Sequence, residues 1–142
     1  MAHVLPVRIY FEDTDASGIV YNANYLMFAE RARTEMLRRI GVTHPTMIRQ
    51  HGRAFAVRRC EADFVKPARL DDLLEVHSRL RDLRGASVVL DQDIVRAGDV
   101  LVRMRFTLAC MANDGRAARI PRGIRDALAG FVIAGSGNGT TG

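Results

Sequence analysis

The residues best suited to chemistry lie together near the N-terminus. Glu12, Asp13 and Asp15 place three carboxylates within four positions, and Gly18 follows where the chain must turn. A helical pattern begins directly afterwards, at Asn22. A carboxylate can act as a nucleophile or a general base, and the free N–H groups of a helix N-terminus stabilise a developing negative charge. The stretch therefore predicts a reactive site; the alternative is a set of ordinary loop and capping residues.

Two elements must hold this stretch, a strand before it and a helix after it. Residues 4–11 alternate apolar and polar side chains, which is typical of a strand. Over residues 22–40 the apolar side chains recur at helical spacing, and Gly41 stands where such a helix ends. Asn22 or Asn24 could cap the start of the helix. We expect the apolar stripe of this helix to pack on a sheet.

The rest of the sequence indicates two short helices and four more strands. The helices are predicted at residues 43–50 and 121–128, and the strands at residues 55–64, 74–81, 88–95 and 100–110. In the first of these strands the apolar parity changes, which a β-bulge near Arg58 and Arg59 would explain. One long early helix and a run of antiparallel strands predict an α+β architecture.

A single domain is expected, covering residues 1–133 of the 142. Residues 134–142 are mostly Gly, Ser and Thr and have nothing to bury, so this tail is predicted to be disordered. There is no apolar run long enough to span a bilayer, and the N-terminus lacks the apolar core of a signal peptide. A cytoplasmic location is therefore expected.

The composition limits the possible partners. The formal net charge is +5, which favours an anionic partner, but the charges are scattered and aromatic residues are only 6%, which disfavours nucleic acid. Neither the four histidines nor Cys60 and Cys110 have the spacing of metal ligands. There is no Gly-rich phosphate loop and no nucleophile elbow. No metal or cofactor is expected.

Several motifs resemble the hotdog-fold acyl-CoA thioesterases, in the branch of 4-hydroxybenzoyl-CoA thioesterase and the Tol-Pal-associated YbgC-type enzymes. The matching segments are residues 12–15, 18–21, 24–25, 30–35, 59–64 and 67–69, and the likeness continues to about Pro121. The resemblance implies a hotdog fold, in which an antiparallel sheet wraps around the long central helix. It also implies an acyl-CoA substrate, and pairing through the sheet into homodimers or homotetramers.

The resemblance also implies catalytic roles. Asp15 falls on the second aspartate of the family's Asp-x-Asp motif, so it would be the nucleophile or the general base, and the sequence does not separate these routes. Asn22 falls at the oxyanion contact of the helix start, where its backbone N–H would point at the thioester oxygen. Many YbgC-type members have His at this position, and close relatives commonly have Tyr at the position of Phe11.

Five residues are expected to contact the substrate: Gly18, Tyr21, Tyr25, Arg84 and Ser87. Tyr25 also begins the apolar stripe of the helix, so a core position is the stronger prediction for it. Arg84 and Ser87 resemble the phosphate-contacting turn of the hydroxybenzoyl-CoA branch, and a solvated arginine is the alternative.

Further expectations concern assembly and function. We expect an active site shared between two subunits, in which Arg58, Arg59, Arg69 and Arg84 reach across to CoA phosphates. The departures at Asn22 and Phe11 leave open a non-catalytic hotdog protein that binds acyl-CoA or acyl carrier protein. A hotdog hydratase is less favoured, because such enzymes resemble a motif that pairs a catalytic His with Asp or Glu. Nucleic-acid binding is suggested by the net charge alone.

Overall fold

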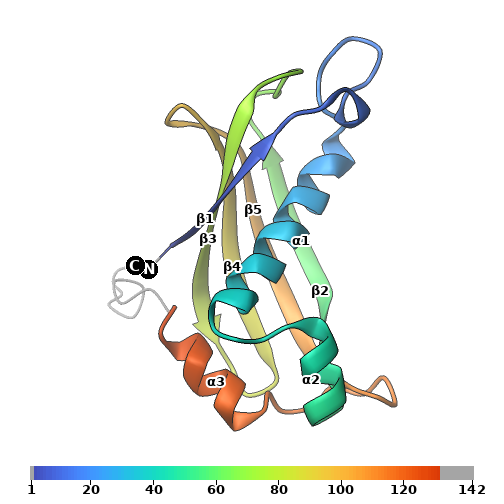
Figure 1. Cartoon of the computed structure of the whole chain (residues 1–142), viewed down its shortest axis with the longest axis vertical. Coiled ribbons are helices and arrows are strands. Elements are labelled where there is room, and N and C mark those ends of the chain that lie inside the picture. Colours follow the sequence, from blue (N-terminus) through green and yellow to red (C-terminus); the bar gives the residue numbers. More distant parts are fainter. Residues whose placement is uncertain (1, 132–142) are drawn as a thin grey trace.

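The computed structural model describes residues 2–131. Five antiparallel strands form one sheet in the order β1-β3-β4-β5-β2, and a long helix lies across one face of it (Figure 1). The elements in chain order are β1 (His3–Arg8), η1 (Phe11–Asp13), α1 (Asn22–Arg39), α2 (His44–His51), β2 (Arg53–Phe64), β3 (Leu73–Leu83), β4 (Ser87–Arg96), β5 (Asp99–Ala112) and α3 (Arg122–Ala129). This is the predicted α+β architecture of a sheet curved around a central helix.

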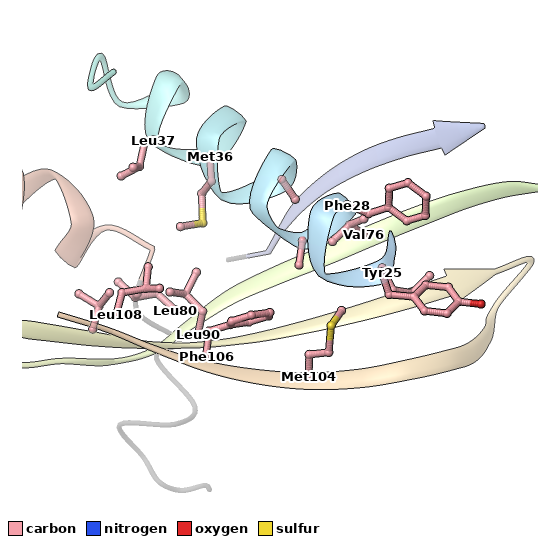
Figure 2. Packing of buried hydrophobic residues seen from close by; sticks show 14 of the residues in the cluster. Tyr25, Phe28, Met36, Leu37, Val76, Leu80, Leu90, Met104, Phe106 and Leu108 are labelled. Atoms are coloured by element: carbon pink, nitrogen blue, oxygen red, sulfur yellow. The ribbon is translucent and has the colours of Figure 1, made fainter. Parts of the chain in front are cut away.

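Helix α1 packs on the sheet through the predicted apolar stripe. Tyr25, Phe28 and Met36 point from α1 into the layer between helix and sheet, as Figure 2 shows. Between these larger groups, Ala29 and Ala32 are fully buried, and their small side chains allow the helix to lie close to the strands. The helix ends as expected before Gly41, which has a φ of 80° that favours glycine.

The strands follow the predicted patterns with local differences. The predicted bulge in β2 is confirmed, because the register with β5 shifts between Val57 and Arg59. β1, however, ends at Arg8 instead of at residue 11. Residues 11–13 form the short 3-10 helix η1, closed by a bond from the Thr14 N–H to the Phe11 carbonyl. The strand prediction was too long there because alternation alone does not show where a strand loses its partner.

The two faces of the sheet differ in character. Alternate residues of the central strands, such as Leu80, Leu90 and Phe106, face α1 and form the core. The opposite face carries cross-strand ion pairs, including Arg105 with Asp91 at 2.7 Å. Within residues 2–131, no helix is long and apolar enough to cross a membrane. The predicted disordered tail, residues 134–142, lies outside the described residues.

Candidate active site

Residues 10–21, here called the acidic loop, join β1 to α1 and are organised around Asp13. This carboxylate is only 8% exposed; it accepts hydrogen bonds from the Tyr10 N–H at 2.9 Å and from the Asn24 side-chain amide at 3.1 Å. The Asp13 carbonyl accepts a third bond, from the Tyr21 N–H. Asp13 therefore holds the loop to the first turn of α1.

The predicted capping of α1 by Asn22 or Asn24 is wrong. Tyr21 occupies the N-cap position and makes no side-chain capping bond. The Asn24 side chain is used by Asp13 instead, and Asn22 is the exposed first residue of the helix. The start of α1 is therefore held by the loop that precedes it and not by a side-chain cap.

The acidic loop is also attached to residues 68–70. The Val20 N–H donates to the Ala68 carbonyl at 3.0 Å, and the Leu70 N–H donates to the Gly18 carbonyl at 3.2 Å. Gly18 has a φ of 83°, which explains why a glycine suits this turn. The Ala68 N–H donates in turn to the Tyr25 hydroxyl at 2.9 Å. Hydrogen bonds, from backbone groups and from the Tyr25 hydroxyl, thus join the loop, residues 68–70 and α1 into one unit.

Tyr25 lies in the core, as its place on the apolar stripe predicted. Its side chain is 2% exposed, and its ring packs edge-on against Phe28 and tilted against Phe64. The hydroxyl is already bonded to Ala68, and burial raises its pKa. In the single chain, therefore, Tyr25 stabilises the acidic loop indirectly, through its bond to Ala68. Tyr21, by contrast, is 52% exposed at the start of the helix.

Asp15 is partly exposed, and one of its oxygens is held by neighbouring groups. Oδ1 accepts bonds from the Ser17 hydroxyl at 2.6 Å, the Ser17 N–H at 2.8 Å and the Ile19 N–H at 3.4 Å. The bonds from Ser17 are the main reason why the pKa of Asp15 is lowered, so the carboxylate is ionised at neutral pH. Oδ2 makes no hydrogen bond within residues 2–131, which leaves it available to attack a carbon or accept a proton.

The N-terminus of α1 offers the complementary group. The first N–H groups of a helix have no partner inside the helix, and the Asn22 N–H bonds to nothing within residues 2–131. Such a group, at the positive end of the helix dipole, can donate to a developing oxyanion. The Asn22 side chain makes no hydrogen bond among the described residues either. Phe11 is 80% exposed at the other end of the loop.

Arg84 and Ser87 lie far from the acidic loop in the same chain. They close the β3–β4 turn, where the Arg84 N–H donates to the Ser87 carbonyl at 2.8 Å. β3 begins beside the end of β1, because Leu73 pairs with Arg8. From there to Arg84 the strand rises by roughly 35 Å, at about 3.3 Å per residue. The turn consequently lies at the α3 end of the sheet, opposite the acidic loop (Figure 1).

Three of the four arginines expected to contact phosphate meet in one open groove. Five arginines line it, Arg58, Arg59, Arg81, Arg84 and Arg105, together with Glu61 and Asp82. This arginine groove lies on the outer face of β2, β3, β4 and β5 and reaches the β3–β4 turn. Arg69 is not part of it, because its backbone forms a β-bridge with Ile19 of the acidic loop. The alternation within residues 74–81 and 100–110 puts Arg81 and Arg105 on the polar faces of their strands, but it does not show that they would share this groove.

Ser17 is a functional neighbour that the sequence analysis missed. Its hydroxyl and N–H both bond to Asp15, two residues earlier. The Asp-x-Ser spacing was the available signal, because an aspartate often accepts bonds from the residue two positions later. No group of His, Cys, Asp and Glu that could hold a metal ion occurs within residues 2–131.

A five-stranded antiparallel sheet curved around a long helix is the fold of hotdog thioesterases. A probable thioesterase from Bartonella henselae superimposes with a TM-score of 0.81 at 35% identity, covering 85% of this chain and all of that one. A 4-hydroxybenzoyl-CoA thioesterase mutant bound to 4-hydroxybenzoyl-CoA gives a TM-score of 0.83 at 24% identity, covering 89% and 97%. At 24% the likeness concerns the fold alone, and the predicted hotdog fold is confirmed.

The family follows from the sequence. Residues 9–128 match the profile of the thioesterase-like superfamily. The acyl-CoA thioesterase YbgC of Haemophilus influenzae is 42% identical over 106 residues, which cover 75% of this chain and 78% of the relative. The acyl-CoA thioester hydrolase YbgC of Escherichia coli O6:H1 is 46% identical over 97 residues, which cover 68% of this chain and 72% of that relative. The chain therefore belongs to the thioesterase-like superfamily, with relatives of the YbgC type, as its motifs predicted.

Proposed function

We propose that the protein hydrolyses an acyl-CoA thioester to the free acid and CoA, with Asp15 as the reactive carboxylate. One observation carries this proposal. The acidic loop, which hydrogen bonds hold in place, carries the ionised carboxylate of Asp15 and leads directly into the helix N-terminus at Asn22, whose N–H has no partner within residues 2–131. Asp15 Oδ2 is free to react within the described chain, and the Asn22 N–H is the donor for the thioester oxygen. Membership of the thioesterase-like superfamily supports the choice of thioester as substrate.

Two routes use the same groups. In the first, Asp15 Oδ2 attacks the carbonyl carbon, the C–S bond breaks, and CoA leaves as a thiolate that takes up a proton. The resulting mixed anhydride is then cleaved by water, which restores the Asp15 carboxylate. In the second, Asp15 removes a proton from a water molecule as that water attacks the carbonyl carbon directly; the C–S bond then breaks, and the CoA thiolate takes up the proton, which restores the Asp15 carboxylate. In both routes the Asn22 N–H stabilises the negative charge on the thioester oxygen.

An assay for free thiol release from a panel of acyl-CoAs tests this proposal. Asp15→Asn should lower kcat by about 10²–10⁴-fold, or more if the carboxylate is the nucleophile. Glu12→Gln is the matched control, because Glu12 is an exposed carboxylate of the same loop and should be dispensable. Equal turnover by wild type and Asp15→Asn would remove Asp15 from the mechanism.

A site shared between two subunits is the second part of the proposal. CoA carries its phosphates on a long arm, and within one chain the arginine groove runs over the outer face of the sheet from mid-strand to the β3–β4 turn, away from the acidic loop. Among residues 2–131, β2 is an edge strand, paired only with β5 along its 12 residues. Antiparallel pairing of β2 with its copy in a partner would place the groove end of one chain beside the loop end of the other. We therefore propose at least a homodimer, with a homotetramer as the larger assembly.

Mixed assemblies test this sharing. Subunits carrying Asp15→Asn should be inactive, and subunits carrying Arg58→Ala, Arg59→Ala and Arg84→Ala should bind substrate weakly. Mixing the two kinds should restore part of the activity, because a hybrid dimer contains one intact site. A fully active monomer in sedimentation experiments would contradict the shared site.

A non-catalytic acyl-CoA or acyl-carrier-protein binder is the alternative. It is favoured by the Asn22 side chain, which supplies no acid or base, and by the exposed Phe11, which has no hydroxyl. Calorimetry that finds tight acyl-CoA binding without turnover at any chain length would support it. Turnover that disappears in Asp15→Asn would exclude it.

A further inference from the structure

Polar side chains interrupt the apolar layer between α1 and the sheet at one place. Gln92 on β4 and Ser78 on β3 are fully buried, and Arg33 on α1 is 9% exposed. Gln92 Nε2 donates to the Ala29 carbonyl at 3.0 Å and to the Ser78 hydroxyl at 2.8 Å. Gln92 Oε1 accepts from Arg33 Nη1 at 2.9 Å, and the guanidinium lies 4.3 Å from the centre of the Phe106 ring.

Gln92 thereby forms hydrogen bonds to two residues of α1, Ala29 and Arg33. Ala29 and Arg33 are four residues apart, so they are neighbours on the same side of α1. Hydrogen bonds are directional, and sliding the helix by one residue, about 1.5 Å, would break both contacts. The apolar contacts around them are not directional. The network therefore sets the axial position of α1 on the sheet.

Stability alone does not explain these polar groups. Burial lowers the pKa of Arg33, which means that the protein interior disfavours its charge. No carboxylate lies within ion-pair distance of Arg33 in residues 2–131. Replacing such buried polar groups with apolar residues of similar volume is often neutral or stabilising. A fixed geometry is a better reason for them than added stability.

The position of α1 matters because its first residue carries the oxyanion donor. Asn22 lies about 16 Å from Arg33 along the helix axis, at about 1.5 Å per residue. Bonds between the acidic loop and the first turn fix one end of the helix, and a second anchor three turns away fixes its tilt. We infer that Gln92, with Arg33 and Ser78, is a positioning group that aligns the Asn22 N–H with Asp15. This inference rests on the proposed thioester hydrolysis.

An apolar version of the network separates positioning from stability. The variant Arg33→Met, Ser78→Ala and Gln92→Met should unfold at no lower denaturant concentration than wild type. Its kcat should nevertheless fall by about 10–10²-fold, since a displacement near 1 Å can have that effect. KM should change little because none of the three residues lies in the arginine groove, and the pH profile should not move because Asp15 is untouched. Met36→Leu, a volume-conserving change on the same helix face, is the control and should leave kcat unchanged.

Further variants keep the test decisive. Arg33→Lys retains a cationic donor toward Gln92 and should keep most of the wild-type kcat. If the triple variant does not fold, the double variant Arg33→Met and Gln92→Met takes its place. Wild-type kcat in a folded apolar variant would overturn the inference while leaving thioester hydrolysis intact. Failure of both apolar variants to fold would assign the network to folding and would also overturn it. A wild type without thioesterase activity would instead refute the proposed function itself.

Discussion

The two ends of the sheet are built in opposite ways. At one end, backbone bonds and buried side chains fix the acidic loop, with Asp13 and Tyr25 at its centre. On the outer face, towards the other end, four of the five groove arginines are exposed, and four of the five pair with surface carboxylates, as Arg84 does with Asp82. A reacting group needs a fixed position. A charged ligand can be bound by exposed arginines whose flexible side chains adjust to its phosphates. Changes at the loop end should therefore affect kcat, and changes at the groove end should affect KM.

Apart from the loss of Asp15 itself, the largest effect is expected at the centre of the acidic loop. Asp13→Ala removes the acceptor for the Tyr10 N–H and for the Asn24 amide. We expect kcat to fall by about 10²-fold through displacement of Asp15. The free energy of unfolding should fall by about 1–3 kcal/mol, because the partly buried Tyr10 N–H and Asn24 amide lose this acceptor. Steady-state kinetics and urea denaturation measure the two effects, and unchanged kcat would refute the rigidity assigned to this end.

A smaller effect at the same end is expected for Tyr25→Phe. The ring still fills the core, but the Ala68 N–H loses its hydrogen-bond partner. The free energy of unfolding should therefore fall by about 1–3 kcal/mol. Since Ala68 also accepts from Val20, kcat should fall by about tenfold as the loop loosens. Tyr10→Phe is the matched control, because the Tyr10 side chain is 63% exposed. Equal kcat in both variants would show that the Tyr25 hydroxyl does not support the site.

At the groove end, Arg84→Gln should change KM and not kcat. Losing one charge-assisted contact to a phosphate should raise KM by about tenfold or less, and added salt should reduce the difference between wild type and variant. Arg116→Gln is the control, since Arg116 is exposed outside the groove. A fall in kcat with unchanged KM would reverse the comparison between the two ends.

The smallest effect concerns the pKa of Asp15. Because its pKa is lowered, the Asp15 carboxylate stays ionised in mildly acidic solution. Activity should therefore fall only at a pH below the pKa of an ordinary aspartate. Ser17→Ala removes the hydroxyl that donates to Oδ1, which raises this pKa. The acidic limb of the kcat/KM profile should therefore move to higher pH, and Ser17→Thr, which keeps a hydroxyl, should restore it. An unmoved limb would mean that Asp15 is not the group titrating there.

The sequence by itself was sufficient for features that depend on neighbouring residues. The apolar period of α1, the stop at Gly41 and the bulge near Arg59 are local patterns, and the structure contains all three. The place of Asp15 before a helix start is local as well. Local spacing did not show that Asn24 would bond to Asp13 instead of capping the helix, because the same amide can accept through its oxygen as a cap or donate through its NH2 group to a carboxylate.

Only the tertiary structure decided which distant residues meet. The order β1-β3-β4-β5-β2 brings arginines of β2, β3 and β5 into one groove and carries Arg84 away from Asp15. It also places Gln92 against Ala29 and Arg33, residues about sixty positions earlier in the chain. Strand order and register depend on pairing between segments far apart in sequence, and no short-range period encodes them.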